Sequence, residues 1–212
     1  MPELFLNVLP KGQQRLWTLL QSERKKLDDW GYYLAGGTAL ALQIGHRQSV
    51  DFDFFSQKPA LGAETRLWLE SFPGFLLREG DAATVHSQIQ GVKASFISGY
   101  KYPLIEKKVL LGKLHAAGIV DIAQMKLLAI THRATLRDYL DLAAILRDHI
   151  PLPYLLKTSK KKYGPEFNPM VSLKAMISFD DVDMELPLLL DKTLKKSWKD
   201  ILRQAVKDVA NN

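Results

Sequence analysis

The pattern of hydrophobic and polar positions divides the chain into two regions. Up to about residue 98, segments with alternating apolar positions come between segments with helical spacing, and from Asp121 onward only helical spacing recurs. In the first region, helices are expected at 12–29, 37–44 and 63–71, and strands at 32–35, 51–55, 75–79, 84–90 and 92–98. In the second region, helices are expected at 121–132, 135–148, 152–162, 168–178 and 193–209.

This order of elements predicts an α/β (α+β) fold in which helices flank a mixed sheet. A strand, a helix and then successive antiparallel strands are typical of such a sheet. We expect residues 1–118 to form the core that contains the sheet. Residues 119–212 are expected to form a helical region that packs on this core and contributes to its cleft.

The strand at 51–55 reads Asp-Phe-Asp-Phe-Phe. Because side chains alternate across a strand, Asp51 and Asp53 share one face, and Phe52 and Phe54 share the other. Two carboxylates this close repel each other unless a cation lies between them, and Mg²⁺ prefers oxygen ligands of this kind. The same alternation is also typical of an ordinary half-exposed strand, so the pair alone leaves both interpretations open.

A glycine pair comes before this strand. Gly36 and Gly37 end an apolar run and open a helix-forming segment, where unpaired N–H groups and the positive end of a helix favour a phosphate. Arg47 and Ser49 then lie between the glycines and the carboxylates and supply a guanidinium and a hydroxyl for phosphate oxygens. Thr38 is interpreted as a residue of the first helical turn and not as a ligand. Together these features favour a phosphate site beside a metal ion.

Composition and charge indicate a globular, soluble protein. The chain has 212 residues, of which 47% are hydrophobic, enough to bury a core. No apolar run approaches ~20 residues and no signal peptide is evident, so a cytoplasmic protein without a membrane span is expected. The chain has no cysteine, which excludes thiolate catalysis and cysteine-ligated zinc. Its net charge of +6 permits a nucleic-acid substrate without requiring one.

Two blocks of sequence closely resemble the AbiEii-type nucleotidyltransferases, which are a branch of the DNA polymerase beta-like nucleotidyltransferase superfamily. The first block is Gly36-Gly37-Thr38-x-Leu40-x-Leu42 followed by Gly45-His46-Arg47-x-Ser49-x-Asp51-Phe52-Asp53-Phe54-Phe55. The second is Asp121-Ile122-Ala123-Gln124-Met125-Lys126-Leu127-Leu128-Ala129-Ile130, then Arg133, then Arg137-Asp138-Tyr139-Leu140-Asp141-Leu142. Both blocks occur in the order that the family has.

The resemblance implies that the second block contributes active-site residues. Taken alone, Lys126 would be a lysine at a helix edge with its ammonium in solvent, and Asp138 and Asp141 would form surface ion pairs or a helix cap. The matching family positions instead line the active site. They imply that Lys126 binds a phosphate and that Asp138, and less firmly Asp141, lies in the cleft.

One carboxylate of the superfamily pattern is missing. Many of its members carry a third acidic metal ligand on a later strand, but the segment 92–97 contains no acid. Three alternatives follow: Asp138 supplies the third ligand, Asp51 and Asp53 hold a single metal ion, or this copy is impaired. Glu79 and Asp81 are weaker candidates because they lie at the end of a strand.

The resemblance also implies an activity, cofactors and partners. The chain is expected to be a metal-dependent nucleotidyltransferase that uses Mg²⁺ or Mn²⁺ and transfers a nucleotidyl group from a nucleoside triphosphate to an acceptor. RNA such as transfer RNA is the expected acceptor, and the protein is expected to be a toxin with a cognate antitoxin, or part of a phage-defence system. The alternatives are a catalytically inactive nucleotide- or partner-binding protein of the same fold, or a kinase-like phosphotransferase that uses the same site.

Overall fold

Two connected units make up the chain in the computed structural model, which describes residues 4–211. Unit 1 comprises the described residues up to Pro103 together with Lys107–Ala117. Unit 2 comprises Leu104–Glu106 together with the described residues from Gly118 onward. The chain therefore passes from one unit to the other after Pro103, after Glu106 and after Ala117, whereas the sequence predicted one boundary near residue 118.

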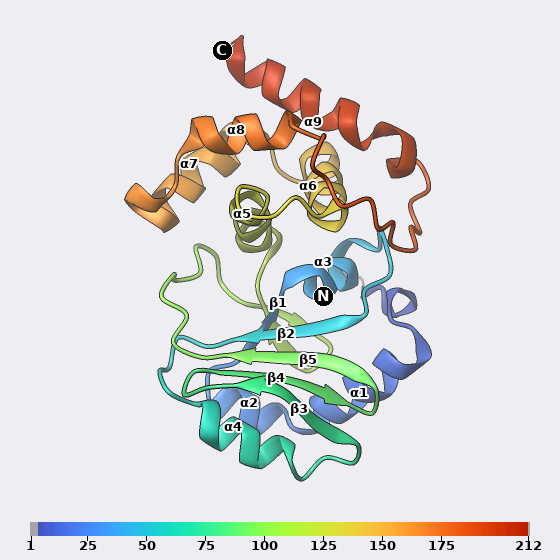
Figure 1. Cartoon of the computed structure of the whole chain (residues 1–212), viewed down its shortest axis with the longest axis vertical. Coiled ribbons are helices and arrows are strands. Elements are labelled where there is room, and N and C mark those ends of the chain that lie inside the picture. The colour runs from blue at the N-terminus through green and yellow to red at the C-terminus, as the bar shows by residue number, and fades with distance from the viewer. Residues whose placement is uncertain (1–3, 212) are drawn as a thin grey trace. The chain divides into compact units, whose positions relative to one another are not determined.

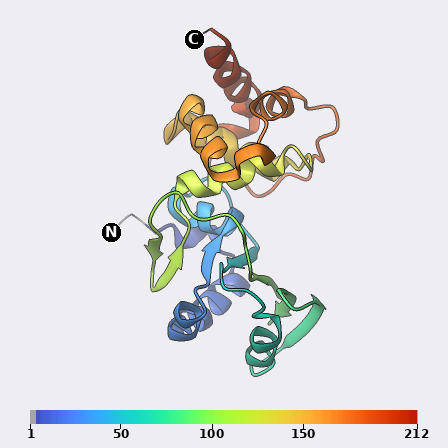
Figure 2. The same ribbon diagram turned by 90° about the vertical axis from the view of Figure 1, so that its left-hand side faces the viewer.

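Unit 1 contains a mixed sheet, as the sequence predicted (Figure 1). Its strands are β1 (Tyr33–Ala35), β2 (Asp51–Phe55), β3 (Phe75–Gly80), β4 (Thr84–Ile89), β5 (Val92–Ile97), β6 (Val109–Leu111) and β7 (Leu114–Ala116). Within residues 4–211 they form one seven-stranded sheet in the order β3-β4-β5-β2-β1-β7-β6. The pairs β2–β5 and β1–β7 are parallel and the other neighbours are antiparallel. Figure 2 shows β3 and the β6–β7 hairpin at opposite ends of the sheet.

Helices of unit 1 pack against the sheet. They are the 3-10 turn η1 (Leu6–Val8), α1 (Lys11–Ser22), α2 (Arg24–Asp29), α3 (Gly36–Ile44) and α4 (Gly62–Leu69). The apolar face of the sheet is covered by α1, whose Trp17 stacks on Phe52 of β2, and by α4, whose Trp68 meets Phe96 of β5 edge to face. Phe52 and Phe54 are fully buried on this face, so the opposite face of β2, which carries Asp51 and Asp53, is the one directed away from the core.

Two local features of unit 1 differ from the sequence prediction. The helix expected at 12–29 is divided into α1 and α2 at Glu23, whose side chain accepts a hydrogen bond from Trp68 Nε1 at 3.1 Å. The hairpin of β6 and β7 was not predicted, because each strand has only three residues and leaves no measurable period in the sequence. Gly112 turns the chain between them with a left-handed φ of 57°.

Unit 2 is helical and is built around α6. Its elements are α5 (Ile119–Ala129), α6 (Leu136–Asp148), α7 (Leu152–Tyr163), the 3-10 turn η2 (Gly164–Glu166), α8 (Pro169–Ile177) and α9 (Leu194–Ala210). Tyr139 of α6 packs edge to face against Phe179 and against Trp198 of α9. These helices agree with the predicted ones to within a few residues at each end. Among residues 4–211, every helix is too short or too polar to span a bilayer.

Candidate functional site

A glycine turn links β1 to α3 and brings the backbone close to a carboxylate. Gly36 has a left-handed φ of 67°, which side-chain-bearing residues rarely adopt. A Cβ atom at Gly36 would lie 2.7 Å from Oδ2 of Asp53, closer than van der Waals contact allows. Glycine is therefore required at this position for two reasons, and its absent side chain leaves the Asp53 carboxylate beside the start of α3.

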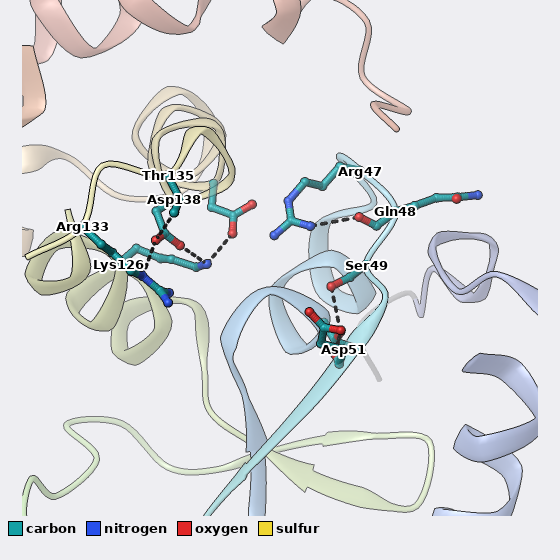
Figure 3. Close-up of polar contacts among 10 residues, drawn as sticks. Arg47, Gln48, Ser49, Asp51, Lys126, Arg133, Thr135 and Asp138 are labelled. Atoms are coloured by element: carbon teal, nitrogen blue, oxygen red, sulfur yellow. Dashed lines mark hydrogen bonds and ion pairs between the residues drawn. The ribbon is translucent and has the colours of Figure 1, made fainter. Parts of the chain in front are cut away.

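The second glycine lies beside Arg47 and Ser49. A Cβ atom at Gly37 would lie 2.5 Å from Arg47 Nη2 and 3.4 Å from Ser49 Oγ. Both side chains are buried, and Arg47 Nη1 donates to the carbonyl of Gln48 at 2.9 Å (Figure 3). The first N–H groups of α3 have no partner within the helix, and the N-cap Ala35 offers no side-chain acceptor. A buried guanidinium beside such a helix start forms an anion-binding arrangement.

Thr38 has a role that the sequence did not suggest. Its hydroxyl donates to the backbone carbonyl of Asp51 and lies within hydrogen-bond distance of Ser49 Oγ, at 2.8 Å. Thr38 is fully buried, so these contacts fix the first turn of α3 against the segment that leads into β2. A hydroxyl residue directly after Gly-Gly was the only signal in the sequence, and it did not indicate which partners the hydroxyl would find.

The two carboxylates of β2 lie on the face that the alternation predicted. Asp51 and Asp53 are partly exposed, whereas Phe52 and Phe54 are buried. In the parallel pairing with β5, Lys93 stands opposite Asp51 and Ser95 stands opposite Asp53. The neighbouring strand therefore supplies no third acid on this face. Among residues 4–211, there is no group of three or more His, Cys, Asp or Glu side chains that could hold a metal ion.

The weaker candidates for a third ligand are also far from Asp53. Glu79 belongs to β3, and both β4 and β5 lie between β3 and β2 in the sheet. At about 4.8 Å per strand, this separation is roughly 14 Å. Asp81 has a structural role, because its Oδ1 accepts hydrogen bonds from the N–H groups of Ala83 and Thr84, both at 2.7 Å. These bonds outweigh the small effect of burial and lower the pKa of the Asp81 carboxyl.

The sequence-predicted residues of unit 2 form a buried ionic cluster. Lys126 Nζ of α5 lies 2.6 Å from Asp138 Oδ1 and 2.7 Å from Asp141 Oδ2, both on α6. The other oxygen of Asp138 accepts hydrogen bonds from Thr135 Oγ1 at 2.7 Å and Arg133 Nε at 3.2 Å (Figure 3). Both oxygens of Asp138 are thus engaged within unit 2, and binding a metal ion would require Asp138 to release these donors.

The charge state of Asp138 follows from these neighbours. Burial raises the pKa of its carboxyl, but the attraction of Lys126 and the hydrogen bonds from Lys126 and Thr135 outweigh burial. The pKa of Asp138 therefore lies below its ordinary value of 3.8, and the group is a carboxylate at neutral pH. This carboxylate holds the ammonium of Lys126 in place through their 2.6 Å contact.

A second buried ion pair links α5 to α7. Lys162 Nζ lies 2.5 Å from Asp121 Oδ1, and both side chains are 0% exposed. Asp121 also accepts the N–H groups of Ile105 at 2.9 Å and Glu106 at 3.0 Å. The sequence placed Asp121 in the second family block but assigned it no partner, because Lys162 is 41 residues away. This pair holds the short segment Leu104–Glu106 to the helices of unit 2.

Comparison with known proteins finds a matching family model and a curated relative of similar length. Residues 18–109, which include the glycine turn and both carboxylates of β2, match the family model described as nucleotidyl transferase AbiEii toxin of a type IV toxin–antitoxin system. An uncharacterised protein of Aquifex aeolicus (strain VF5) is 34% identical over 193 residues. The alignment covers 85% of this chain and 89% of that relative.

Solved structures with the same fold have low sequence identity to this chain. MenT4, a nucleotidyltransferase toxin of Mycobacterium tuberculosis H37Rv, superposes with a TM-score of 0.62 at 17% identity and covers 93% of this chain and 84% of its own. A putative nucleotidyltransferase from Helicobacter pylori gives a TM-score of 0.55 at 17% identity over 95% of this chain and 98% of its own. JHP933, also from Helicobacter pylori, gives a TM-score of 0.54 at 18% identity, and the match covers 96% of this chain and 95% of JHP933. The predicted nucleotidyltransferase fold is thereby confirmed.

Proposed function

We propose, because this chain belongs to the AbiEii nucleotidyltransferase toxin family, that it transfers a nucleotidyl group from a nucleoside triphosphate to an acceptor hydroxyl. One observation carries the proposal. The turn at Gly36 and Gly37 lies against both parts of a nucleotide site: Asp53 beside the first glycine, and Arg47 with Ser49 beside the second. Phosphate-binding groups and metal-binding groups therefore meet at the start of one helix.

Each group of this site has a chemical role in the proposal. The N–H groups at the start of α3, together with Arg47 and Ser49, bind phosphate oxygens and orient the triphosphate. Thr38 holds Ser49 in place for that contact. An acceptor hydroxyl oxygen forms a bond to the α-phosphorus, the bond from that phosphorus to the α–β bridging oxygen breaks, pyrophosphate leaves, and the hydroxyl proton passes to solvent. The protein acts mainly by positioning and by neutralising charge.

The carboxylates of β2 fit a magnesium or manganese ion. Asp51 and Asp53 provide oxygen donors on one face of the strand, and Gly36 leaves room for the Asp53 carboxylate beside the start of α3. Mg²⁺ is commonly bound through one or two carboxylates together with substrate phosphates, so a third acid is not essential for binding. When bound, such an ion neutralises developing negative charge on the phosphates.

Lys126 and Asp138 stay predicted active-site residues. Asp138 contacts Lys126 directly, so we propose that it acts by holding the lysine ammonium, and that Lys126 is the group directed to a phosphate. Substitution of Lys126 would then lower the rate of transfer more than substitution of the exposed Arg133. Arg133 contacts Oδ2 of Asp138, whereas Lys126 contacts Oδ1.

RNA is the acceptor that we propose, with transfer RNA as the leading candidate. The net charge of +6 supports a polyanionic acceptor, and exposed lysines on α7 and α9 contribute to it. The family description as part of a toxin–antitoxin system supports a cognate antitoxin as a partner.

A catalytically inactive nucleotide-binding protein is the second candidate. One observation favours it. On the neighbouring strand β5, the residues opposite the two aspartates of β2 are Lys93 and Ser95, and neither is an acid. The two candidates are separated by incubating the chain with α-labelled or γ-labelled nucleoside triphosphates, total RNA and candidate protein acceptors. Label from the α position in RNA supports nucleotidyl transfer. Nucleotide binding without any transfer supports the inactive protein, and γ label in protein supports a kinase.

A further inference from the structure

A row of aromatic rings continues the polar face of β2 beyond the carboxylates. Phe55 follows Asp53 by two residues and therefore lies on the same face of the strand. Its ring meets Tyr33 in a stacked arrangement with centroids 6.3 Å apart, and Tyr100 edge to face at 5.0 Å. Tyr100 in turn meets Tyr102 at 5.6 Å. We call Phe55, Tyr100 and Tyr102 the aromatic row.

Backbone hydrogen bonds hold the aromatic row at the end of β2. The N–H of Tyr100 donates to the carbonyl of Ser56 at 2.9 Å, and the N–H of Gly99 donates to the carbonyl of Lys58 at 2.8 Å. These bonds fold the chain after β5 back onto the chain after β2. The rings are thus attached to the same rigid sheet that carries the carboxylates.

The aromatic row differs from the aromatic core of unit 1. On the opposite face of the sheet, Phe52, Phe54 and Phe96 are at most 1% exposed and serve packing. The three rings of the row remain partly exposed to solvent. Lys101 Nζ lies 4.8 Å from the centre of the Tyr102 ring, and Lys108 Nζ lies 4.9 Å from that of Tyr33, which stacks on Phe55. Flat partly exposed rings with adjacent lysines suit an aromatic, negatively charged ligand.

The order of groups along this face matches the order of groups in a nucleotide. Arg47 and Ser49 lie beside Gly37, Asp53 lies beside Gly36, and Phe55 follows about 6.6 Å further along the strand. A nucleoside triphosphate has its terminal phosphates, its α-phosphate and its nucleoside in the same sequence. We propose that the aromatic row is the stacking surface for the nucleobase of the bound nucleoside triphosphate. This inference rests on the proposed nucleotide site.

Stacking sets a limit on how strongly the base is discriminated. Every nucleobase has a π face, so a surface of rings binds all of them and favours those with the larger ring area. Purine nucleotides are therefore expected to bind more tightly than pyrimidine nucleotides, and the discrimination is expected to disappear when the rings are removed.

A binding experiment separates recognition of the base from recognition of the phosphates. The dissociation constants of an α,β-methylene analogue of ATP and of inorganic tripolyphosphate are measured by calorimetry with Mg²⁺ and the full-length chain. Substitution Tyr100→Leu removes a ring and keeps an apolar side chain, and Tyr100→Phe keeps the ring as the matched control. We expect Tyr100→Leu to weaken analogue binding by roughly 5- to 150-fold. Tripolyphosphate binding should remain unchanged, and Tyr100→Phe should bind like the wild type.

The possible outcomes each decide the proposal. Tyr102→Leu provides a second variant at the outer end of the row, so the test does not depend on the fold of one variant. Equal weakening of both ligands, or no weakening of either in the two leucine variants, overturns the stacking surface while leaving the phosphate site in place. If wild-type chain binds neither ligand, the proposed nucleotide site itself fails, and this inference fails with it.

Discussion

Gly36 is the residue at which backbone conformation and chemistry depend on each other most closely. Its left-handed φ excludes most side chains, and its missing Cβ leaves room for Asp53 Oδ2. We expect Gly36→Ala to displace the Asp53 carboxylate and to lower the rate of nucleotidyl transfer by about 100-fold or more, the effect of misplacing a reacting group by ~1 Å. The rate is measured with labelled nucleotide, together with the melting temperature.

Gly164 supplies the matched control for this substitution. It also has a positive φ, of 56°, but a Cβ atom there would meet nothing within 4 Å. Gly164→Ala therefore carries a backbone strain of about 1–3 kcal/mol without the clash. Equal activity of the two alanine variants would contradict the account of Gly36.

Asp138 makes the stability of the folded protein fall at acidic pH, because its neighbours lower the pKa of its carboxyl. Its folded-state pKa is below the ordinary 3.8, so its stabilising contribution is complete above that value and is lost as pH falls through the folded-state pKa. We expect Asp138→Asn to lower the free energy of unfolding near neutral pH by about 1–3 kcal/mol. The difference between wild type and variant should shrink as urea unfolding is measured from about pH 7 to about pH 3.

The control for this pH series is Asp200→Asn. The Asp200 side chain is 80% exposed, so its removal should change the unfolding free energy little at any pH. If the difference in unfolding free energy between wild type and Asp138→Asn stayed constant down to acidic pH, this would contradict the lowered pKa of Asp138.

Single residues were predictable from the sequence where one short-range rule governs them. The period of two in a strand was enough to place Asp51 and Asp53 on one face. The partners of Lys126 were not predictable, because α5 and α6 must pack before Asp138 and Asp141 reach its ammonium. The contact of Thr38 with Ser49 depends in the same way on how α3 meets the chain before β2.

Elements were predictable where their hydrophobic period is long. The helices α5 to α9 and the strands β2 to β5 fall close to their predicted ranges. The break between α1 and α2 was not predictable from the sequence. A contact from Trp68 to Glu23 accompanies the break, and no glycine or proline marks it. The three-residue strands β6 and β7 are too short for any period to identify them.

The pairing of α5 with α7 leads to a prediction about stability. Lys162→Met leaves the buried Asp121 carboxylate without its cation, and we expect a loss of about 3–5 kcal/mol in the free energy of unfolding. The double variant Asp121→Asn/Lys162→Met removes both charges and should be more stable than Lys162→Met alone. Both values are measured by chemical denaturation.

An exposed lysine on the same helix provides the control. Lys161→Met, on the solvent side of α7, should change the unfolding free energy by no more than about 0.5 kcal/mol. If Lys162→Met were as stable as Lys161→Met, the buried pair would not hold α7 to α5.

For the whole molecule, the sequence predicted a sheet followed by helices but not how the chain connects them. The segment Leu104–Glu106 belongs with unit 2 although it lies between two stretches of unit 1. Its N–H groups are bound by Asp121, which is reached only after β6 and β7. A connection of this kind depends on a contact between distant residues and has no local signature.

The function of the whole molecule depends on whether two carboxylates are enough for nucleotidyl transfer. The glycine turn, the aspartates and the aromatic row all belong to unit 1, and β5 contributes no further acid. If the protein is an active nucleotidyltransferase, Asp51 and Asp53 must support nucleotidyl transfer without an acid from β5.

The most direct test measures transfer of α-labelled nucleotide to RNA in the presence of Mg²⁺, comparing wild type with Asp51→Asn/Asp53→Asn and with the surface control Asp200→Asn. We expect labelled RNA with the wild type and with the control, and a rate of transfer at least about 1,000-fold lower in the double variant. Transfer by the double variant at the wild-type rate, or label entering only protein and only from the γ position, would contradict it.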